Sequence, residues 1–237
     1  MCIFPFEVDM YRKYGIDVHY CGHPLIKQLP NKANREEFFV RHGLDLNKPL
    51  ISVFPGSRPL ELKFLANTLI GGAKMLQKKH PELQFCISHA PNLPDNIFDK
   101  YVKDLHFKII KGENQALLSV SDSLILASGT VALEAALYQV PMIIGYKGPW
   151  ILYLAYLLFR CIKQVSLPNI VTGEDIVPEL IQKKFTKHNI CYETERMLYD
   201  KKYRAEVTEK LGHVREKLSD KYSALEAAGC ILEELQN

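Results

Sequence analysis

The chain has 237 residues, of which 47% are hydrophobic and 24% are charged. This is ordinary globular composition, and it argues against collagen-like, coiled-coil and largely disordered architectures. The net charge of +3 is too small to indicate nucleic-acid binding from bulk electrostatics, although it permits a local site for an anion or an acidic membrane face. The length predicts one large domain, or one domain with appendages.

Six cysteines are spread along the chain, and none forms a Cys-x-x-Cys pair. Because the chain is long enough to bury a core without cross-links, we expect reduced thiols in a cytoplasmic protein. Residues 1–6 are mostly apolar but Glu7 and Asp9 follow at once, so we expect no signal peptide. The most hydrophobic stretch, 150–159, is shorter than the roughly 20 residues that span a bilayer.

Strands and helices are predicted to alternate in the middle of the chain. Short apolar runs ended by proline, glycine or serine predict the strands, and apolar residues at helical spacing predict the helices. The predicted strands are 50–54, 84–88, 107–110, 123–127 and 141–145, and the predicted helices are 59–79, 95–103, 114–120 and 130–139. This alternation predicts an α/β fold, a Rossmann-like parallel sheet with helices on both faces.

The pattern changes after Gly145. We expect a helix over 149–160, a short extended piece over 164–169, and helices from Ile176 onward. Two apolar stripes at helical spacing predict packing helices near the C-terminus. They are Val207, Leu211, Val214 and Leu218, and then Leu225, Ala228, Leu232 and Leu235.

Ligands of such sheets bind at the carboxyl ends of the strands, where Ser128, Gly129 and Thr130 follow one strand and open a helix. The N–H groups of a helix start suit a phosphate, Gly129 lets the backbone approach it closely, and both hydroxyls can donate to it. Glu134, one turn into the helix, can accept from the hydroxyls of a ribose. A Ser/Thr-capped core helix with a solvated glutamate is an equally favoured interpretation.

A second candidate segment, Pro55–Glu61, also lies between a strand and a helix. Pro59 and Glu61 are a typical start signal for that helix, and Glu61 then only complements the helix dipole. Arg58 stands at the carboxyl end of the strand, where five donors in a plane suit a diphosphate or a departing phosphate oxygen. A solvated arginine is the alternative, and the commoner one for a lone loop arginine.

The remaining candidates are weaker. Asn169 follows a proline, a pattern more typical of a turn than of a binding residue. Two pairs, Cys21 with His23 and Cys86 with His89, match no familiar zinc spacing, so we predict no metal site and no cofactor.

The predicted helix 149–160 carries four aromatic residues between basic flanks. It can rest on an anionic bilayer, or it can be buried against this chain or another domain, which is the commoner case. The aromatic residues are Trp150, Tyr153, Tyr156 and Phe159.

Several segments, taken in order, resemble lipid-A-disaccharide synthase, the glycosyltransferase of lipopolysaccharide biosynthesis. Each is weak alone, but their common order is specific. They are Phe4-Pro5-Phe6-Glu7 with Tyr11, Gly22-His23-Pro24-Leu25, Phe54-Pro55-Gly56-Ser57-Arg58-Pro59-Leu60-Glu61, and Ser128-Gly129-Thr130-Val131-Ala132-Leu133-Glu134 with Ser166-Leu167-Pro168-Asn169.

The resemblance implies the C-terminal, donor-binding half of a two-domain GT-B fold. It implies metal-free, inverting transfer of 2,3-diacylglucosamine from UDP to lipid X, which gives lipid A disaccharide 1-phosphate and UDP. Arg58 would stabilise the leaving group. The residues implied to bind the UDP-sugar are Gly56, Ser57, Arg58, Ser128, Gly129, Thr130, Glu134 and Asn169.

Members of this family begin with another Rossmann-like domain, which binds the acceptor and carries the acidic base. We find no credible base here, so we expect a fragment, one half of a split enzyme, or the product of a decaying gene. The expected divisions are 1–26 for a remnant of the acceptor domain and the crossover, 27–170 for the UDP-sugar-binding domain, and 171–237 for a C-terminal helical segment.

The leading hypothesis is therefore a transferase half that needs an N-terminal acceptor domain, or a separate chain carrying it, as partner. We expect it in the cytoplasm, peripheral on the inner membrane of a Gram-negative bacterium. A non-catalytic UDP-binding remnant and a GT-B-like UDP-sugar 2-epimerase are the alternatives.

Overall fold

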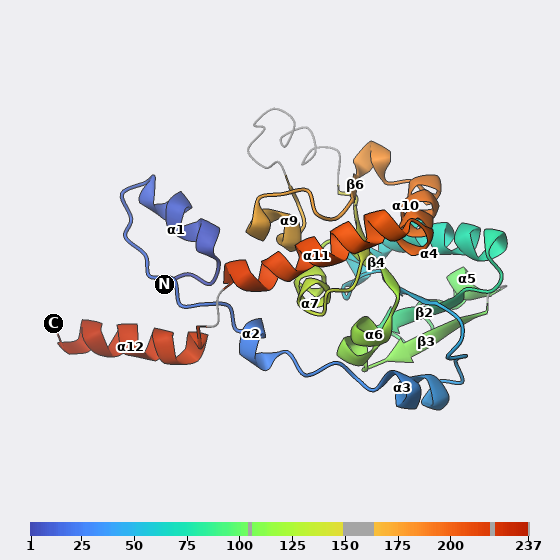
Figure 1. Ribbon diagram of the computed structural model, residues 1–237, viewed down its shortest axis with the longest axis horizontal. Helices are drawn as coiled ribbons and strands as arrows, with labels where there is room; N and C mark the ends of the chain where they lie inside the picture. The colour runs from blue at the N-terminus through green and yellow to red at the C-terminus, as the bar shows by residue number, and fades with distance from the viewer. Residues whose placement is uncertain (104–105, 149–163, 219–220, 237) are drawn as a thin grey trace.

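The computed structural model describes residues 1–103, 106–148, 164–218 and 221–236. Its centre is a six-stranded, all-parallel sheet in the order β3-β2-β1-β4-β5-β6 (Figure 1). The strands are β1 (Leu50–Phe54), β2 (Gln84–His89), β3 (Phe107–Lys111), β4 (Ser123–Ala127), β5 (Met142–Tyr146) and β6 (Glu179–Ile181). The fold class and five of these strands are confirmed.

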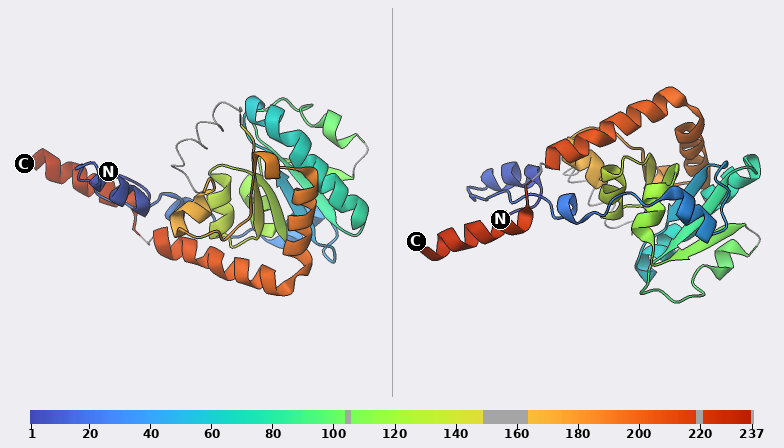
Figure 2. Two further views of the ribbon diagram at one scale, coloured as in Figure 1. Left: turned by 90° about the horizontal axis from the view of Figure 1, so that it is seen from above. Right: turned by 60° about the horizontal axis from the view of Figure 1, so that its bottom comes forward.

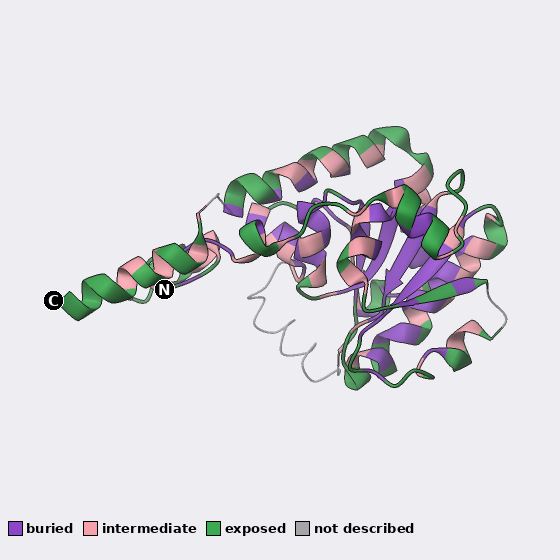
Figure 3. Cartoon of the chain, turned by 90° about the horizontal axis from the view of Figure 1, so that it is seen from below, coloured by how far each residue is buried: buried purple, intermediate pink, exposed green. Residues whose placement is uncertain are grey.

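Helices cover both faces of the sheet, because alternate residues of each strand point to opposite sides. In β1, Leu50 and Phe54 belong to one buried cluster, whereas Ile51 and Val53 belong to the other. The first cluster includes residues of α3 (Arg35–Arg41), α6 (Asn114–Val120), α7 (Val131–Leu137), α9 (Leu167–Thr172) and α11 (Lys201–Leu218). The second includes residues of α4 (Pro59–Lys79) and α10 (Lys187–Tyr199), with α5 (Asp99–Val102) packed beside it. Figure 3 shows the buried strands between these layers.

The long helix α4 has the bounds that its pattern predicts. Pro59 occupies its first turn and the predicted apolar face is buried. Gly72 lies where α4 meets α10, since a β-carbon there would stand 2.4 Å from Ile190 Cγ2. The two helices therefore approach more closely than any larger residue would allow.

Two expectations for residues 164–181 are wrong. Residues 164–169 are not one extended piece, because α9 begins at Leu167. The chain from Ile176 is not wholly helical either, since β6 forms the edge of the sheet before a short 3-10 turn, Gln182–Lys184. Only three residues long, β6 is too brief to show a periodic pattern.

The two predicted stripes behave differently. The stripe from Val207 to Leu218 is buried on α11, as expected. The second stripe lies on α12 (Ser223–Gln236), which buries none of its residues; Leu225 and Leu235 are exposed. The expectation that α12 packs on the core is therefore wrong.

Helix α12 lies beside the N-terminal segment, away from the sheet (Figures 1 and 2). That segment contains α1 (Pro5–Arg12) and a bridge between Cys2 and Tyr20, and α2 (Leu25–Gln28) then leads toward the core. His19 Nε2 and Glu226 Oε2, 3.4 Å apart, connect the segment to α12.

The predicted helix 149–160 falls outside the described residues. Within the part of the chain that the structure describes, no helix has the length and apolar character needed to cross a membrane.

Candidate functional site

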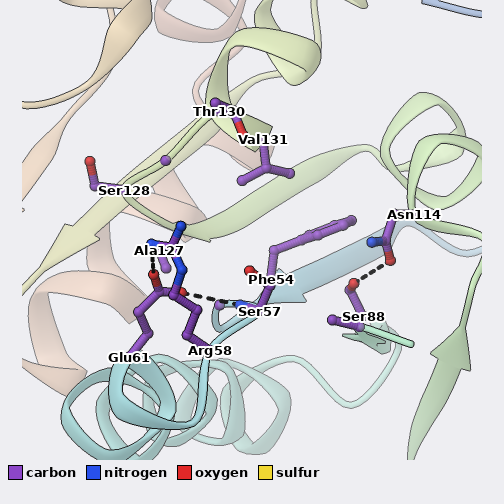
Figure 4. Close-up of a pocket in the computed structure, with 13 residues that line it drawn as sticks. Phe54, Ser57, Arg58, Glu61, Ser88, Asn114, Ala127, Ser128, Thr130 and Val131 are labelled. Atoms are coloured by element: carbon purple, nitrogen blue, oxygen red, sulfur yellow. Dashed lines mark hydrogen bonds and ion pairs between the residues drawn. The ribbon is translucent and has the colours of Figure 1, made fainter. Parts of the chain in front are cut away.

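A pocket of about 300 Å³ opens at the carboxyl ends of β1, β2 and β4 (Figure 4). The structure therefore brings the two strongest sequence candidates together at one place. Its lining residues are Phe54, Gly56, Ser57, Arg58, Glu61, Ser88, Ala90, Asn114, Ala127, Ser128, Gly129, Thr130 and Val131.

One wall is the turn between β1 and α4. Gly56 has a φ of +119°, which glycine adopts without strain. Glu61 holds this turn: one carboxylate oxygen accepts from Ser57 N at 3.1 Å, and the other from Arg58 Nη1 at 3.0 Å. Glu61 thus does more than complement the helix dipole. Arg58 remains mostly exposed and available to an anion.

The opposite wall is the turn between β4 and α7. Ser128 is anchored, since its N–H donates to Gly145 O and its Oγ donates to Val165 O at 3.0 Å. Gly129 and Thr130 are exposed, and a β-carbon on Gly129 would meet no atom within 4 Å. There is consequently open space over Gly129 for a ligand. Its φ is not positive, so the backbone conformation itself does not require glycine here.

The floor contains residues that sequence reasoning did not name. Ser88 is the next-to-last residue of β2 and Asn114 begins α6, and Ser88 Oγ lies 2.6 Å from Asn114 Oδ1. Ser88 lies at the carboxyl end of β2 and Asn114 follows β3, and both ends were expected to face a ligand, so their position in the topology was the available signal. They add a hydroxyl and an amide to the pocket.

Glu134 does not line this pocket, but it lies near its edge. It is three residues after Val131, on the same side of α7, and it hydrogen-bonds to Gln115, the neighbour of Asn114. Burial raises the pKa of Glu134, and the hydrogen bond from Gln115 opposes that shift only in part. A ligand that leaves the pocket between α6 and α7 would meet this carboxylate.

Asn169 is not brought into the pocket. It is fully buried in α9, so it is neither a turn residue nor exposed to this pocket. Its amide nitrogen donates to Val177 O and to Glu179 Oε1, and its oxygen accepts from the N–H groups of Ile176 and Val177. These four bonds use all of its donors and acceptors.

The pocket can bind an anion between its two walls. Arg58 provides a planar, charged donor on one side, and the start of α7 provides backbone N–H groups on the other. The two walls are the turns that follow β1 and β4, and they face the same pocket. A phosphorylated ligand in the pocket would therefore touch both turns. The polar floor can orient the rest of such a molecule.

Solved structures show the same architecture. The chain superposes on UDP-GlcNAc 2-epimerase from Neisseria meningitidis with a TM-score of 0.64 and 15% identity, over 95% of this chain and 58% of that one. Sucrose-phosphate synthase from Thermosynechococcus elongatus gives 0.57 and 14%, over 99% and 58%. Identities this low show a shared GT-B-like fold and nothing of the reaction.

Sequence comparison is more specific. Lipid-A-disaccharide synthase from Chromobacterium violaceum is 34% identical over 218 residues, which are 87% of this chain and 55% of the relative. The enzyme of the same name from Trichlorobacter lovleyi is 34% identical over 97% of this chain and 61% of its own length. The chain thus spans between half and two thirds of these relatives. The family model for lipid-A-disaccharide synthetase matches residues 1–234, and the chain belongs to that family.

Proposed function

We propose that this chain supplies the UDP-sugar-binding half of a glycosyltransferase of lipid A biosynthesis. The reaction would transfer 2,3-diacylglucosamine from UDP to lipid X. The observation that carries the proposal is the convergence of the turns at Arg58 and Gly129 on one pocket. These are the turns that carry the family resemblance, so motif and geometry agree.

The diphosphate would lie between the two turns. Gly56, Ser57 and Arg58 would bind it from one side, and Gly129 and Thr130 from the other, while the anchored Ser128 holds that turn in place. As the bond to the sugar breaks, negative charge grows on the departing UDP. A guanidinium and fixed N–H groups at that position stabilise the charge and lower the barrier.

The nucleoside would extend toward α6 and α7. Ser88 and Asn114 can hydrogen-bond to polar edges on the pocket floor, and Glu134 can accept from the ribose hydroxyls. In the proposed role Asn169 acts indirectly. Its amide donates to Glu179, and the same carboxylate accepts from the N–H groups of Val165 and Ser166. Ser128 in turn is anchored to the carbonyl of Val165.

The acceptor site and the base would come from a partner domain, either on a longer chain or on a separate one. The lengths of the relatives support this. So do α1 and α12, two helices that lie to one side of the core (Figure 2) and carry exposed apolar residues such as Met10, Leu225 and Leu232. Proximity to the inner membrane through residues 149–160 stays a prediction.

Calorimetric titration with UDP tests the donor site. We expect saturable binding to the chain, weakened in Arg58→Ala and unchanged in Lys63→Ala, an exposed lysine of α4 outside the pocket lining. The absence of detectable heat at millimolar UDP, from chain shown to be folded, would refute the proposal.

Mixing with a separately expressed N-terminal half of a relative tests the transferase. Formation of disaccharide from the diacylated donor and lipid X would support it and exclude a non-catalytic remnant. Conversion of soluble UDP-GlcNAc by the chain alone would instead support the epimerase alternative.

A further inference from the structure

A second group of reactive side chains lies away from the pocket, where α12 meets the N-terminal segment. His19, Cys21 and Cys230 place one potential ligand atom each within 4.8 Å of the others. No other set of three or more His, Cys, Asp or Glu side chains meets this criterion in the described ranges. The sequence pattern paired Cys21 with His23. In the structure Cys21 lies instead beside His19 and Cys230.

We propose that His19, Cys21 and Cys230 bind one zinc-type divalent ion that fastens α12 to the N-terminal segment. Thiolate and imidazole are the ligands that zinc prefers, and they disfavour magnesium and calcium. With Zn–S bonds of about 2.3 Å, tetrahedral ligand atoms stand roughly 3.7 Å apart. The three side chains therefore have to close by only about 1 Å from the limit of 4.8 Å. Water would take the fourth position.

The surroundings suit a ligand histidine. Glu226 Oε2 lies 3.4 Å from His19 Nε2. When Nε2 carries the proton and donates to this carboxylate, Nδ1 keeps the lone pair that a metal needs. Lys221 Nζ, also 3.4 Å from Glu226 Oε2, holds the carboxylate from the other side. Glu226 would therefore be a positioning residue that orients the histidine.

The two cysteines favour binding coupled to proton release. Cys21 is buried, and burial together with the adjacent Cys230 thiol raises the pKa of Cys21. A thiol binds a metal as thiolate, so each metal–sulfur bond that forms replaces an S–H bond and its proton goes to solvent.

The ion would give α12 an anchor that packing does not provide. This helix buries none of its residues, and the ion pair that joins Glu226 to His19 is exposed. Exposed ion pairs contribute little to stability. Bonds from one ion to His19, Cys21 and Cys230 would connect opposite ends of the chain directly.

Cobalt titration of the reduced, metal-free full chain tests the site, because Co²⁺ reports thiolate ligands by charge-transfer absorption. We expect one equivalent to bind with tetrahedral visible bands, and Zn²⁺ to displace it. Cys230→Ser should weaken binding more than the roughly 10- to 100-fold typical of losing an outer-shell partner, and Glu226→Gln should fall in that range. Cys191→Ser, on α10, is the matched control and should bind as the parent does.

Three results would overturn the proposal. The first is a titration without charge-transfer bands, and the second is equal weakening by Cys191→Ser and Cys230→Ser. The third is a Cys21–Cys230 disulfide that forms in air despite equimolar zinc, which would make the pair a redox couple. None of them bears on UDP binding, since the cluster shares no residue with the pocket.

Discussion

Arg58 Nη1 lies 3.0 Å from Glu61 Oε1, one turn along the start of α4. The same glutamate accepts from Ser57 N, so one carboxylate both shapes the turn and neutralises its cation. An incoming diphosphate must compete with Glu61 for the guanidinium. Because Arg58 is 79% exposed, the pair is held weakly and the arginine can turn toward a ligand.

Arg58→Ala should therefore weaken UDP binding without unfolding the protein. Loss of a charged hydrogen bond to phosphate costs roughly 1.5–3 kcal/mol, which is about a 10- to 150-fold rise in Kd. Loss of an exposed ion pair should leave the unfolding midpoint nearly unchanged. Calorimetry and thermal unfolding measure the two effects, with Lys63→Ala as control. An unchanged Kd would remove Arg58 from the site.

The glycines of the two turns should respond in opposite ways. Gly56→Ala forces a β-carbon to φ +119° and to within 2.7 Å of Glu61 Oε2, which should cost about 1–3 kcal/mol of unfolding free energy. Gly129→Ala meets no atom and should change stability by less than about 0.5 kcal/mol.

The same pair of variants also reports on the ligand. If phosphate lies against Gly129, the alanine should raise the Kd for UDP although the fold is intact. Urea unfolding and UDP titration of both variants measure this. Unchanged UDP affinity in Gly129→Ala would place the phosphate elsewhere.

Periodicity predicted the elements that are long or bounded by strong turn residues. Helix α4 and strands β1 and β4 match their predicted bounds, because each joins a regular apolar pattern to a proline, glycine or serine. The three-residue β6 carries no detectable period, and it forms only because it can pair with β5. Such tertiary pairing is not visible in local sequence.

The site was predictable to the extent that topology determines it. The carboxyl-end rule, applied to β1 and β4, led to Arg58 and Gly129, and the structure places both in one pocket. The rule could not reveal that every polar atom of the Asn169 side chain would hydrogen-bond to residues 176–179, since those bonds depend on how α9 and β6 pack. The contact of Cys21 with Cys230 was equally hidden, because it joins opposite ends of the chain.

Asn169→Ala should lower stability. The substitution leaves the N–H groups of Ile176 and Val177 without their acceptor in a buried position, which costs roughly 1–3 kcal/mol for each unpaired group. Urea unfolding measures the loss. Asn189→Ala, which removes one exposed bond to Lys184 O, is the control and should have little effect. A stable Asn169→Ala protein with weakened UDP binding would instead give Asn169 the direct role that the motif suggested.

Glu195 should make the contact between α4 and α10 sensitive to acid. Hydrogen bonds from Lys79 and then His80 lower the pKa of Glu195. A carboxyl group whose pKa is lowered by folding stabilises the folded state at pH values above the ordinary glutamate pKa. This contribution is lost as the pH falls through the lowered pKa. Glu195→Gln should thus be less stable than the parent at neutral pH.

The difference should shrink as the pH falls through that acidic window, and urea unfolding across a pH series measures it. Glu216→Gln, an exposed glutamate of α11, provides the control for the loss of one charge. A stability difference that is constant with pH would contradict the assignment.

Glu134 should show the opposite sign. Burial raises its pKa, so the folded state holds the proton more tightly than the unfolded chain does. Its protonated form therefore favours the fold below the ordinary glutamate pKa, and that advantage disappears as the pH rises through the raised value. At neutral pH the partly buried charge opposes folding, and Glu134→Gln should raise the unfolding midpoint there.

The gain should vanish in acid, where the parent is protonated as well. If the carboxylate accepts from a ribose, the same variant should bind UDP more weakly while it discriminates less between UDP and 2′-deoxy-UDP. Stability gained together with affinity lost would show a charge kept for its ligand, because removing a purely structural carboxylate would leave both nucleotides bound as before. Thermal unfolding at two pH values and paired titrations with the two nucleotides separate these outcomes.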